Sequence, residues 1–298
     1  MHRLLGIIML ALLCALVCGG AMAGEYNLDW GVVAGGGDSG TSASYRLTVT
    51  AGQPAAGFAQ GTSQLHWIGF LTGEMSMPTV APSILAAKFM PDGTFVSLAG
   101  RIATSGIGDF PAFFYVEELD RINGIRIAAP PSAVSGLARG SVVNVIGTLG
   151  TTPNDERQLT GPIVIIASTA EPLAPLSMSN AWLGGGDIPR DPPIGQYGVW
   201  RWQTRREDNK WVRKWLPSPD LNNIGLLIQT WGKVTAVGAG YVEIDDGEGP
   251  VRVDTATLAS QPALDSYVSV IGISSIHKTE TDRRRLVLPR GDLDVILR

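Results

Sequence analysis

The segment GVWRWQTRREDNKWVRKWLP, residues 198–217, combines the residue types that best suit an anionic ligand. Between residues 201 and 214 it has six basic side chains against two acidic ones, a local charge of +4, and it contains four of the chain's eight tryptophans. Clustered cations bind phosphate or sulfate groups, and exposed indoles stack on bases. The candidate ligand-binding residues here are Trp200, Arg201, Trp202, Arg205, Arg206, Trp211, Arg213, Lys214 and Trp215.

The alternation in this segment predicts a hairpin, because residues i and i+2 share one face of a strand. Trp200 and Trp202 then line one side of the first arm, Trp211 and Trp215 line one side of the second, and residues 205–210 form the turn. Two interpretations remain open. The hairpin packs on the rest of the protein with its charges solvated, which we favour because cross-strand indole pairs are ordinary stabilisers. Alternatively, it binds a polyanion, a single-stranded nucleic acid or a glycan.

A second basic cluster lies between two predicted strands near the end of the sequence. Its members are Lys278, Arg283, Arg284 and Arg285. We include them among the candidate ligand-binding residues, with a solvated loop tip as the alternative.

Other patterns argue against catalysis and metal binding. His66 and His277 are isolated from any carboxylate pattern, and no Gly-x-Ser-x-Gly motif occurs. The glycines of residues 35–40 match a dinucleotide fingerprint, but a strand pattern follows them where a helix is needed, so we interpret them as a turn. Residues 245–249 are acidic but lack the spacing of a calcium loop, and their Asp-Gly predicts a hairpin turn. We therefore expect a non-enzymatic protein with no catalytic residue, metal or cofactor, and a hydrolase is the least favoured alternative.

The first residues have the features of a signal peptide. Arg3 precedes an apolar run from Leu4 to Val17, and Ala21–Ala23 form a small-x-small cleavage site. Both cysteines lie inside this segment, so cleavage after Ala23 leaves a chain without disulfides. We expect a secreted or periplasmic protein with no membrane span in the mature chain. The net charge of −4, which becomes −5 without Arg3, argues against general binding of polyanions. A nucleic-acid-binding role would therefore need a local basic patch.

Two sets of five strand patterns follow a linker at residues 74–82. The first set is Thr94–Thr104, Ala112–Glu117, Gly124–Ala128, Ser141–Leu149 and Arg157–Ile166. The second set is Leu226–Val237, Tyr241–Asp245, Val251–Asp254, Tyr267–Ile273 and Arg285–Ile296. A stretch without strand character separates the third and fourth patterns of each set.

The two sets are related in sequence. FVSLAGRIAT at Phe95 aligns with LIQTWGKVTA at Leu227, and GSVVNVIGTLG aligns with DSYVSVIGISS. The alignment places Tyr115 on Tyr241 and Gly147 on Gly272 at nearly constant offset, which indicates an internal duplication.

Five strands with a connector between the third and fourth, and a YVEIDDGEG hairpin, resemble the OB-fold domains of bacterial exported proteins. The stretch YRLTVTAGQPAAGF resembles a Gly-rich β-module of such proteins. The resemblance implies an all-β chain with two tandem OB-like five-stranded barrels. The expected parts are a signal peptide at 1–23, a Gly-rich β-module at 24–73, a first barrel at 84–168, a linker with the Trp/Arg-rich hairpin at 169–220, and a second barrel at 221–298.

The resemblance also implies a ligand face on the second and third strands of each barrel. In the first unit, the expected outward residues are Phe113, Tyr115, Glu117 and Arg126. In the second unit they are Tyr241, Glu243, Asp245, Arg252 and Asp254. We expect cross-strand pairs between the glutamate and the arginine at corresponding positions, Glu117 with Arg126 and Glu243 with Arg252.

Overall fold

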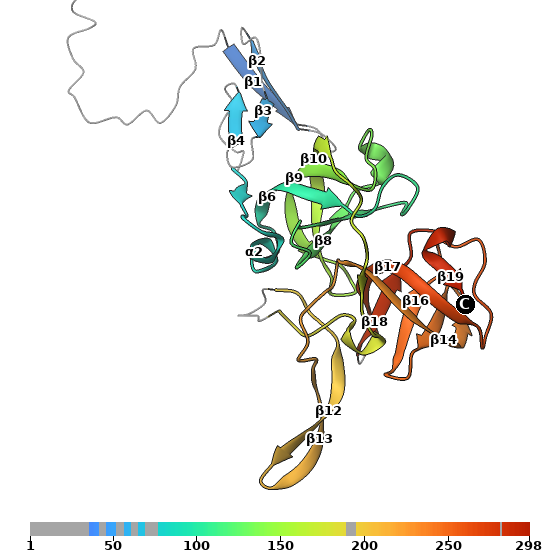
Figure 1. Ribbon diagram of the computed structural model, residues 1–298. Coiled ribbons are helices and arrows are strands. Elements are labelled where there is room, and N and C mark those ends of the chain that lie inside the picture. Colours follow the sequence, from blue (N-terminus) through green and yellow to red (C-terminus); the bar gives the residue numbers. More distant parts are fainter. Residues whose placement is uncertain are drawn as a thin grey trace, which may run out of the picture. The chain divides into compact units, whose positions relative to one another are not determined.

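The computed structural model describes residues 36–41, 46–51, 57–60, 65–68, 77–188, 195–280 and 282–298. Its contacts divide the chain into two compact units, residues 1–59 with 66–75 and residues 60–65 with 76–298. The chain is all-β and contains a closed five-stranded barrel (Figure 1). None of the helices in the described ranges is long and apolar enough to cross a membrane.

Four short strands lie in the N-terminal region. They are β1 (Gly36–Thr41), β2 (Arg46–Ala51), β3 (Gly57–Gln60) and β4 (Leu65–Ile68), and they pair as β1–β2 and β3–β4. The prediction of a turn at residues 35–40 was wrong, because β1 occupies most of that range and pairs with β2. The predicted signal peptide and its cleavage site lie outside the described residues.

The first sheet, defined as β5 to β10, has the strand order β5-β6-β7-β8-β10-β9, and β9 also pairs with β6. Neighbouring strands are antiparallel except at β5–β6 and β8–β10. All five predicted strands are present with closely similar bounds. The elements are β5 (Thr79–Val80), α2 (Ile84–Lys88), β6 (Phe95–Ala103), β7 (Phe114–Glu117), β8 (Gly124–Ala128), η1 (Pro131–Ala133), β9 (Ser141–Thr151) and β10 (Arg157–Thr169).

The second sheet, defined as β11 and β14 to β19, has the order β11-β14-β15-β16-β18-β17-β19, and β17 also pairs with β14. The fifth strand of the second set, β18, ends at Leu288, because Pro289 has no N–H to continue the ladder. Residues that follow form β19, which pairs with β17. The elements are β11 (Leu176–Ser177), η2 (Asn180–Trp182), β14 (Leu227–Gly238), β15 (Tyr241–Asp245), β16 (Pro250–Asp254), β17 (Tyr267–Lys278), β18 (Arg283–Leu288), η3 (Asp292–Asp294) and β19 (Val295–Leu297).

Corresponding strands of the two sheets pair in corresponding register. Across the antiparallel pairs β6–β9 and β14–β17, the matching facing residues are Val96 with Gly147 and Ile228 with Gly272. Across the parallel pairs β8–β10 and β16–β18, they are Arg126 with Gln158 and Arg252 with Leu286. The agreement extends to the strand that precedes each set, since β5 and β11 pair in parallel with the same positions of β6 and β14.

One hairpin departs from the sequence alignment by two residues. Tyr115 faces Arg126, whereas Arg252, the counterpart of Arg126, faces Glu243 as expected. The position of Tyr115 in the first sheet is therefore occupied in the second by Glu243 and not by Tyr241.

An arginine covers an aromatic ring at the same place in both hairpins. The guanidinium of Arg126 lies 3.7 Å from the ring centroid of Phe113, and that of Arg252 lies 3.6 Å from the ring of Tyr241. This shared stacking supports the register equivalence, in which Phe113 corresponds to Tyr241.

The interior of each sheet follows the predicted alternation. Inward side chains of β15 and β16 are buried, and the outward ones are only half-buried. The buried clusters centre on Val96, Leu98, Phe114, Ile125, Val143 and Leu159 in the first sheet, and on Ile228, Val234, Ile244, Val251, Val270 and Val287 in the second.

The outer face of β7 and β8, expected to bind ligand, is instead packed against the second sheet. Tyr115 and Glu117 are fully buried. The apolar contact joins Tyr115 and Phe110 to Leu227, Ile273, Leu286 and Leu288. The expected pair of Glu117 with Arg126 was wrong, because the Glu117 carboxylate accepts hydrogen bonds from the backbone N–H of Leu227 and from Arg121.

Polar groups also cross this interface. The Glu156 carboxylate accepts a 2.9 Å hydrogen bond from the Tyr115 hydroxyl and a 2.8 Å hydrogen bond from the Ser275 hydroxyl. Burial raises the pKa of Glu156, and burial together with Glu156 raises the pKa of Tyr115. The backbone segments of the two repeats approach closely at Gly124 and Gly225, where a Cβ on Gly124 would lie 2.2 Å from the Gly225 carbonyl oxygen.

Lys88, in the last turn of α2, is fully buried beside this interface and donates a 3.0 Å hydrogen bond to the carbonyl of Ile224. Burial lowers its pKa to about 8, with Arg157 acting in the same direction and Glu156 opposing it. Between that value and the ordinary pKa of 10.5, the unfolded chain binds more protons than the folded one. The free energy of unfolding should therefore rise with pH in this window.

We expect wild-type stability, relative to Lys88→Met, to increase by roughly 1–2 kcal/mol between pH 8 and pH 9.5. Urea unfolding of both proteins across this range is the measurement. Tyr115 is present in both proteins, so its ionisation contributes equally to the two profiles. Parallel pH profiles for the two proteins would contradict a depressed pKa at Lys88.

Candidate functional site

The Trp/Arg-rich segment forms a two-stranded hairpin of β12 (Trp200–Glu207) and β13 (Lys210–Pro217). The turn is shorter than predicted, because the strands continue to Glu207 and Lys210. Asp208 and Asn209 have φ values of 47° and 62°, both left-handed. Two such residues are typical of a type I′ turn, which matches the twist of the flanking strands.

The hairpin register places the tryptophan positions of both arms on one face. Trp202 is the Cα partner of Trp215, and Arg206 is the partner of Trp211. Directly opposed residues share a face, so Trp200 belongs to this face too. The residues at alternate positions, on the other face, are Arg201, Gln203, Arg205, Glu207, Lys210, Val212, Lys214 and Leu216.

The outer half of the hairpin is exposed to solvent. Trp211 is 73% exposed, and Arg205 and Arg206 are exposed beside it. Trp200 and Trp215, nearer the base, are half-buried, and the indole N–H of Trp200 has no hydrogen-bond acceptor among the described residues. We favoured the interpretation that the hairpin packs on the rest of the protein. That interpretation does not explain the exposure of the outer half.

Part of the charge of the hairpin is balanced locally. Lys214 lies 2.6 Å from Glu207, Arg201 lies 3.3 Å from Asp220, and Arg206 donates to the side chain of Asn209. Such exposed pairs contribute little to stability and exchange readily with an incoming anion. Arg205 and Lys210 form no hydrogen bond or ion pair with any residue that the structure describes. Lys210 was absent from the predicted site, although it belongs to the same run of charge.

The base of the hairpin is fixed to the second sheet. Val199 is buried with Ile224 and Ile276, and its carbonyl accepts a 2.9 Å hydrogen bond from the N–H of Ser218. Gln196, also buried, donates from its amide to the carbonyl of Asp155. The exposed outer half of the hairpin therefore extends from an ordered base.

The second predicted cluster is largely occupied by internal contacts. Lys278 and Arg283 both bind the Asp155 carboxylate, at 3.0 and 2.6 Å, and Arg283 also lies over the ring of Tyr197. Arg285 donates to the backbone carbonyls of Ala181, within η2, and of Leu183, directly after it. Arg284 is exposed and lies 3.8 Å from Asp282, and Lys278 is exposed as well despite its contact with Asp155.

The structure brings one member of this cluster to the hairpin. Burial, together with the nearby charge of Arg201, lowers the pKa of Arg285. Arg285 thus lies at the base of the hairpin. Lys278 and Arg283 instead connect the second sheet to Asp155 of the first sheet. These contacts could not be predicted from the sequence, because Asp155 is distant along the chain from Lys278 and Arg283.

Within the described ranges, no group of three or more histidine, cysteine or acidic residues is arranged to hold a metal ion. The acidic stretch 245–249 forms a turn, in which the Asp245 carboxylate accepts hydrogen bonds from the N–H groups of Gly247 and Gly249. No protein-family profile matches the chain, and no curated protein matches it.

Proposed function

We propose that the chain is an exported, non-enzymatic binding protein in which two OB-fold barrels hold a basic aromatic hairpin that binds a single-stranded polyanion. The observation that carries this proposal is the place of the hairpin in the repeat. Residues 89–94 connect α2 to β6, whereas residues 183–226 connect the corresponding η2 to β14. The first repeat makes the link without the hairpin, so the fold does not require it.

The assignment to OB barrels is supported by strand order. In both sheets the five strands follow the cyclic order first, second, third, fifth, fourth, with the third and fifth parallel. This is the topology of the five-stranded Greek-key barrel called the OB fold. Its usual ligand face is covered in the first repeat, which leaves the insertion as the more accessible binding element.

The choice of a polyanion follows from the chemistry of the hairpin. Its cations lie on both faces, and an aromatic face carries Trp211 beside Arg206. Cations neutralise phosphates or sulfates, and an exposed indole stacks on a base. A single-stranded nucleic acid uses both features, whereas a sulfated glycan depends mainly on the cations.

The test uses the unmodified protein, an Arg205→Ser/Lys210→Ser variant and a Trp211→Ala variant, each titrated with oligothymidylate and with heparin over a range of salt. For oligothymidylate, we expect the double variant to reduce the magnitude of the slope of log affinity against log salt concentration by about 1.4. We expect Trp211→Ala to weaken oligothymidylate binding by about 1–3 kcal/mol if one base stacks there. Heparin binding should depend on the cations but little on the indole.

The matched control is Lys233→Ser/Arg298→Ser, which removes the same charge from a half-buried and an exposed position outside the hairpin. It should bind as the unmodified protein does. Equal losses in both double variants would indicate general electrostatic attraction and contradict a hairpin site. If the unmodified protein binds neither polymer at low salt, the proposal fails.

A further inference from the structure

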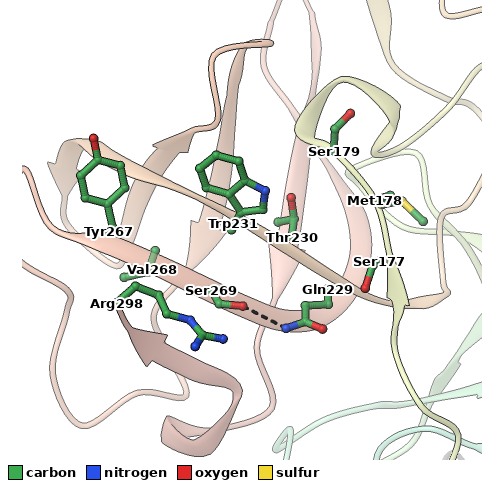
Figure 2. A pocket seen from close by; sticks show the side chains of 10 residues that line it. All are labelled: Ser177, Met178, Ser179, Gln229, Thr230, Trp231, Tyr267, Val268, Ser269 and Arg298. Carbon is green, nitrogen blue, oxygen red and sulfur yellow. Dashed lines mark hydrogen bonds between the residues drawn. The ribbon is translucent and has the colours of Figure 1, made fainter.

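An open groove of about 760 Å³ lies on the outer surface of the second sheet, and none of its lining residues belongs to β12 or β13 (Figure 2). It crosses β14 and β17, which pair directly, and is bordered by the residues after β11 and by the end of the chain. The lining residues are Ser177, Met178, Ser179, Gln229, Thr230, Trp231, Tyr267, Val268, Ser269 and Arg298.

Two aromatic rings stand exposed in this groove. Trp231 is 54% exposed and Tyr267 is 50% exposed, and Figure 2 shows both side chains on the same side of the ribbon. Trp231 faces Ser269 across the strand pair, so Tyr267 is its diagonal neighbour. Among the described residues, neither ring contacts another ring or a stacked cation. The two rings therefore present apolar surface that the protein itself leaves uncovered.

Polar side chains surround the rings. The Gln229 amide donates a 3.0 Å hydrogen bond to the Ser269 hydroxyl, which orients both groups at the floor of the groove. The hydroxyls of Ser177 and Ser179 and the guanidinium of Arg298 form no hydrogen bond with other described side chains or backbone. Donors and acceptors are thus available beside the aromatic surface.

The repeat provides an internal control for these residues. At the positions that correspond to Trp231 and Tyr267, the first sheet has Ala99 and Val142. The same strands pair there without an aromatic side chain, with a β-bulge between Leu98 and Arg101 that β14 and β17 lack. The aromatic pair is therefore not needed to form the sheet.

The combination selects a class of ligand. A pyranose ring has a face of C–H groups, which packs on indole and phenol rings, and a rim of hydroxyls, which needs mixed donors and acceptors. Arg298 is the one cation among the described residues that line the groove, and Lys233 at its edge lies 2.7 Å from Asp265. A neutral sugar suits this surface better than a nucleic acid, which requires several cations.

We propose that this groove is a binding site for a neutral oligosaccharide, stacked on Trp231 and Tyr267 and hydrogen-bonded to Gln229 and the serine hydroxyls around them. The site is independent of the hairpin and lies on the first and fourth strands of the barrel.

The experiment is calorimetric titration of the full chain with cellohexaose and with N-acetylchitohexaose. We expect at least one of them to bind, and Trp231→Ala to reduce that affinity at least tenfold. The matched control is Trp182→Ala, which removes an indole that is 61% exposed but lies outside the groove. This control should bind as the unmodified protein does, and all variants should keep its thermal midpoint within a few degrees.

Three results would overturn the proposal. Neither hexasaccharide binds at millimolar concentration, or Trp231→Ala binds as tightly as the unmodified protein, or Trp182→Ala loses affinity to the same extent. Removal of hairpin cations should leave saccharide binding unchanged, so failure of this site and failure of the polyanion site are distinguishable.

Discussion

Replacing Gly124 by alanine is expected to lower the free energy of unfolding by about 3 kcal/mol, because backbone cannot move aside as a side chain can. The added Cβ would lie 2.2 Å from the carbonyl oxygen of Gly225. The reverse contact is as close, with a Cβ on Gly225 only 2.5 Å from the Gly124 carbonyl oxygen. The substitution forces the two sheets apart at the centre of their contact.

The matched control is Gly150→Ala in β9, where the nearest atom to the new Cβ is a Thr160 methyl at 3.6 Å. An alanine fits there, and its lower unfolded-state entropy makes the change neutral or slightly stabilising. Urea unfolding compares the two variants with the wild type. An unchanged midpoint for Gly124→Ala would mean that the two sheets do not approach as described.

Replacing Arg290 by methionine is expected to cost about 3–5 kcal/mol, because it leaves a carboxylate buried without its counter-ion. Arg290 and Asp294 are both buried, and two guanidinium nitrogens bind the carboxylate at 2.8 and 2.9 Å. The third nitrogen donates to the carbonyl of Thr104 in the first sheet.

The double variant Arg290→Met/Asp294→Leu separates the two parts of this loss. With neither charge present, most of the stability should return, and the remaining deficit reflects the lost hydrogen bonds. Urea unfolding of the four proteins of this cycle gives the coupling. A double variant as unstable as Arg290→Met alone would contradict the explanation through an unpaired buried charge.

The strands were predictable because alternation is a local property. Gly124–Ala128 and Tyr241–Asp245 match their predicted bounds, and the duplication was visible in the sequence. The hairpin of β12 and β13 was predictable for the same reason, and its register follows from its two-residue turn. The short strands β5 and β11 were not predicted, because two residues are too few to give a pattern.

Burial of outward-facing residues was not predictable, because it depends on which surfaces of the two sheets pack against each other. Tyr115 has the alternation of an exposed strand residue and is buried only because the second sheet covers it. The basic cluster at Lys278 and Arg283 looked solvated for the same reason, since its acceptor, Asp155, belongs to the other sheet. Trp231 was overlooked because a single aromatic in a strand gives no periodic signal.

The contact between the two sheets uses different surfaces of related structures, so it is heterologous in the sense applied to subunits. Such an arrangement is head-to-tail and open-ended, because each unit has one surface to offer and another to accept. The outer face of β7 and β8, with Tyr115, is the offered surface of the first repeat. Leu227, Ile273, Leu286 and Leu288 form the accepting surface of the second.

Each surface left over carries polar residues where its counterpart is apolar. On the second repeat, Glu243 occupies the position of Tyr115. On the first repeat, Thr148, Gln158 and Thr160 occupy the positions of the apolar residues Ile273, Leu286 and Leu288, whereas Phe95 keeps an apolar side chain at the position of Leu227. A further copy packed in the same way would meet polar side chains at most of the positions that form the apolar contact between the two repeats, so each repeat resembles the terminal cap of a repeat array.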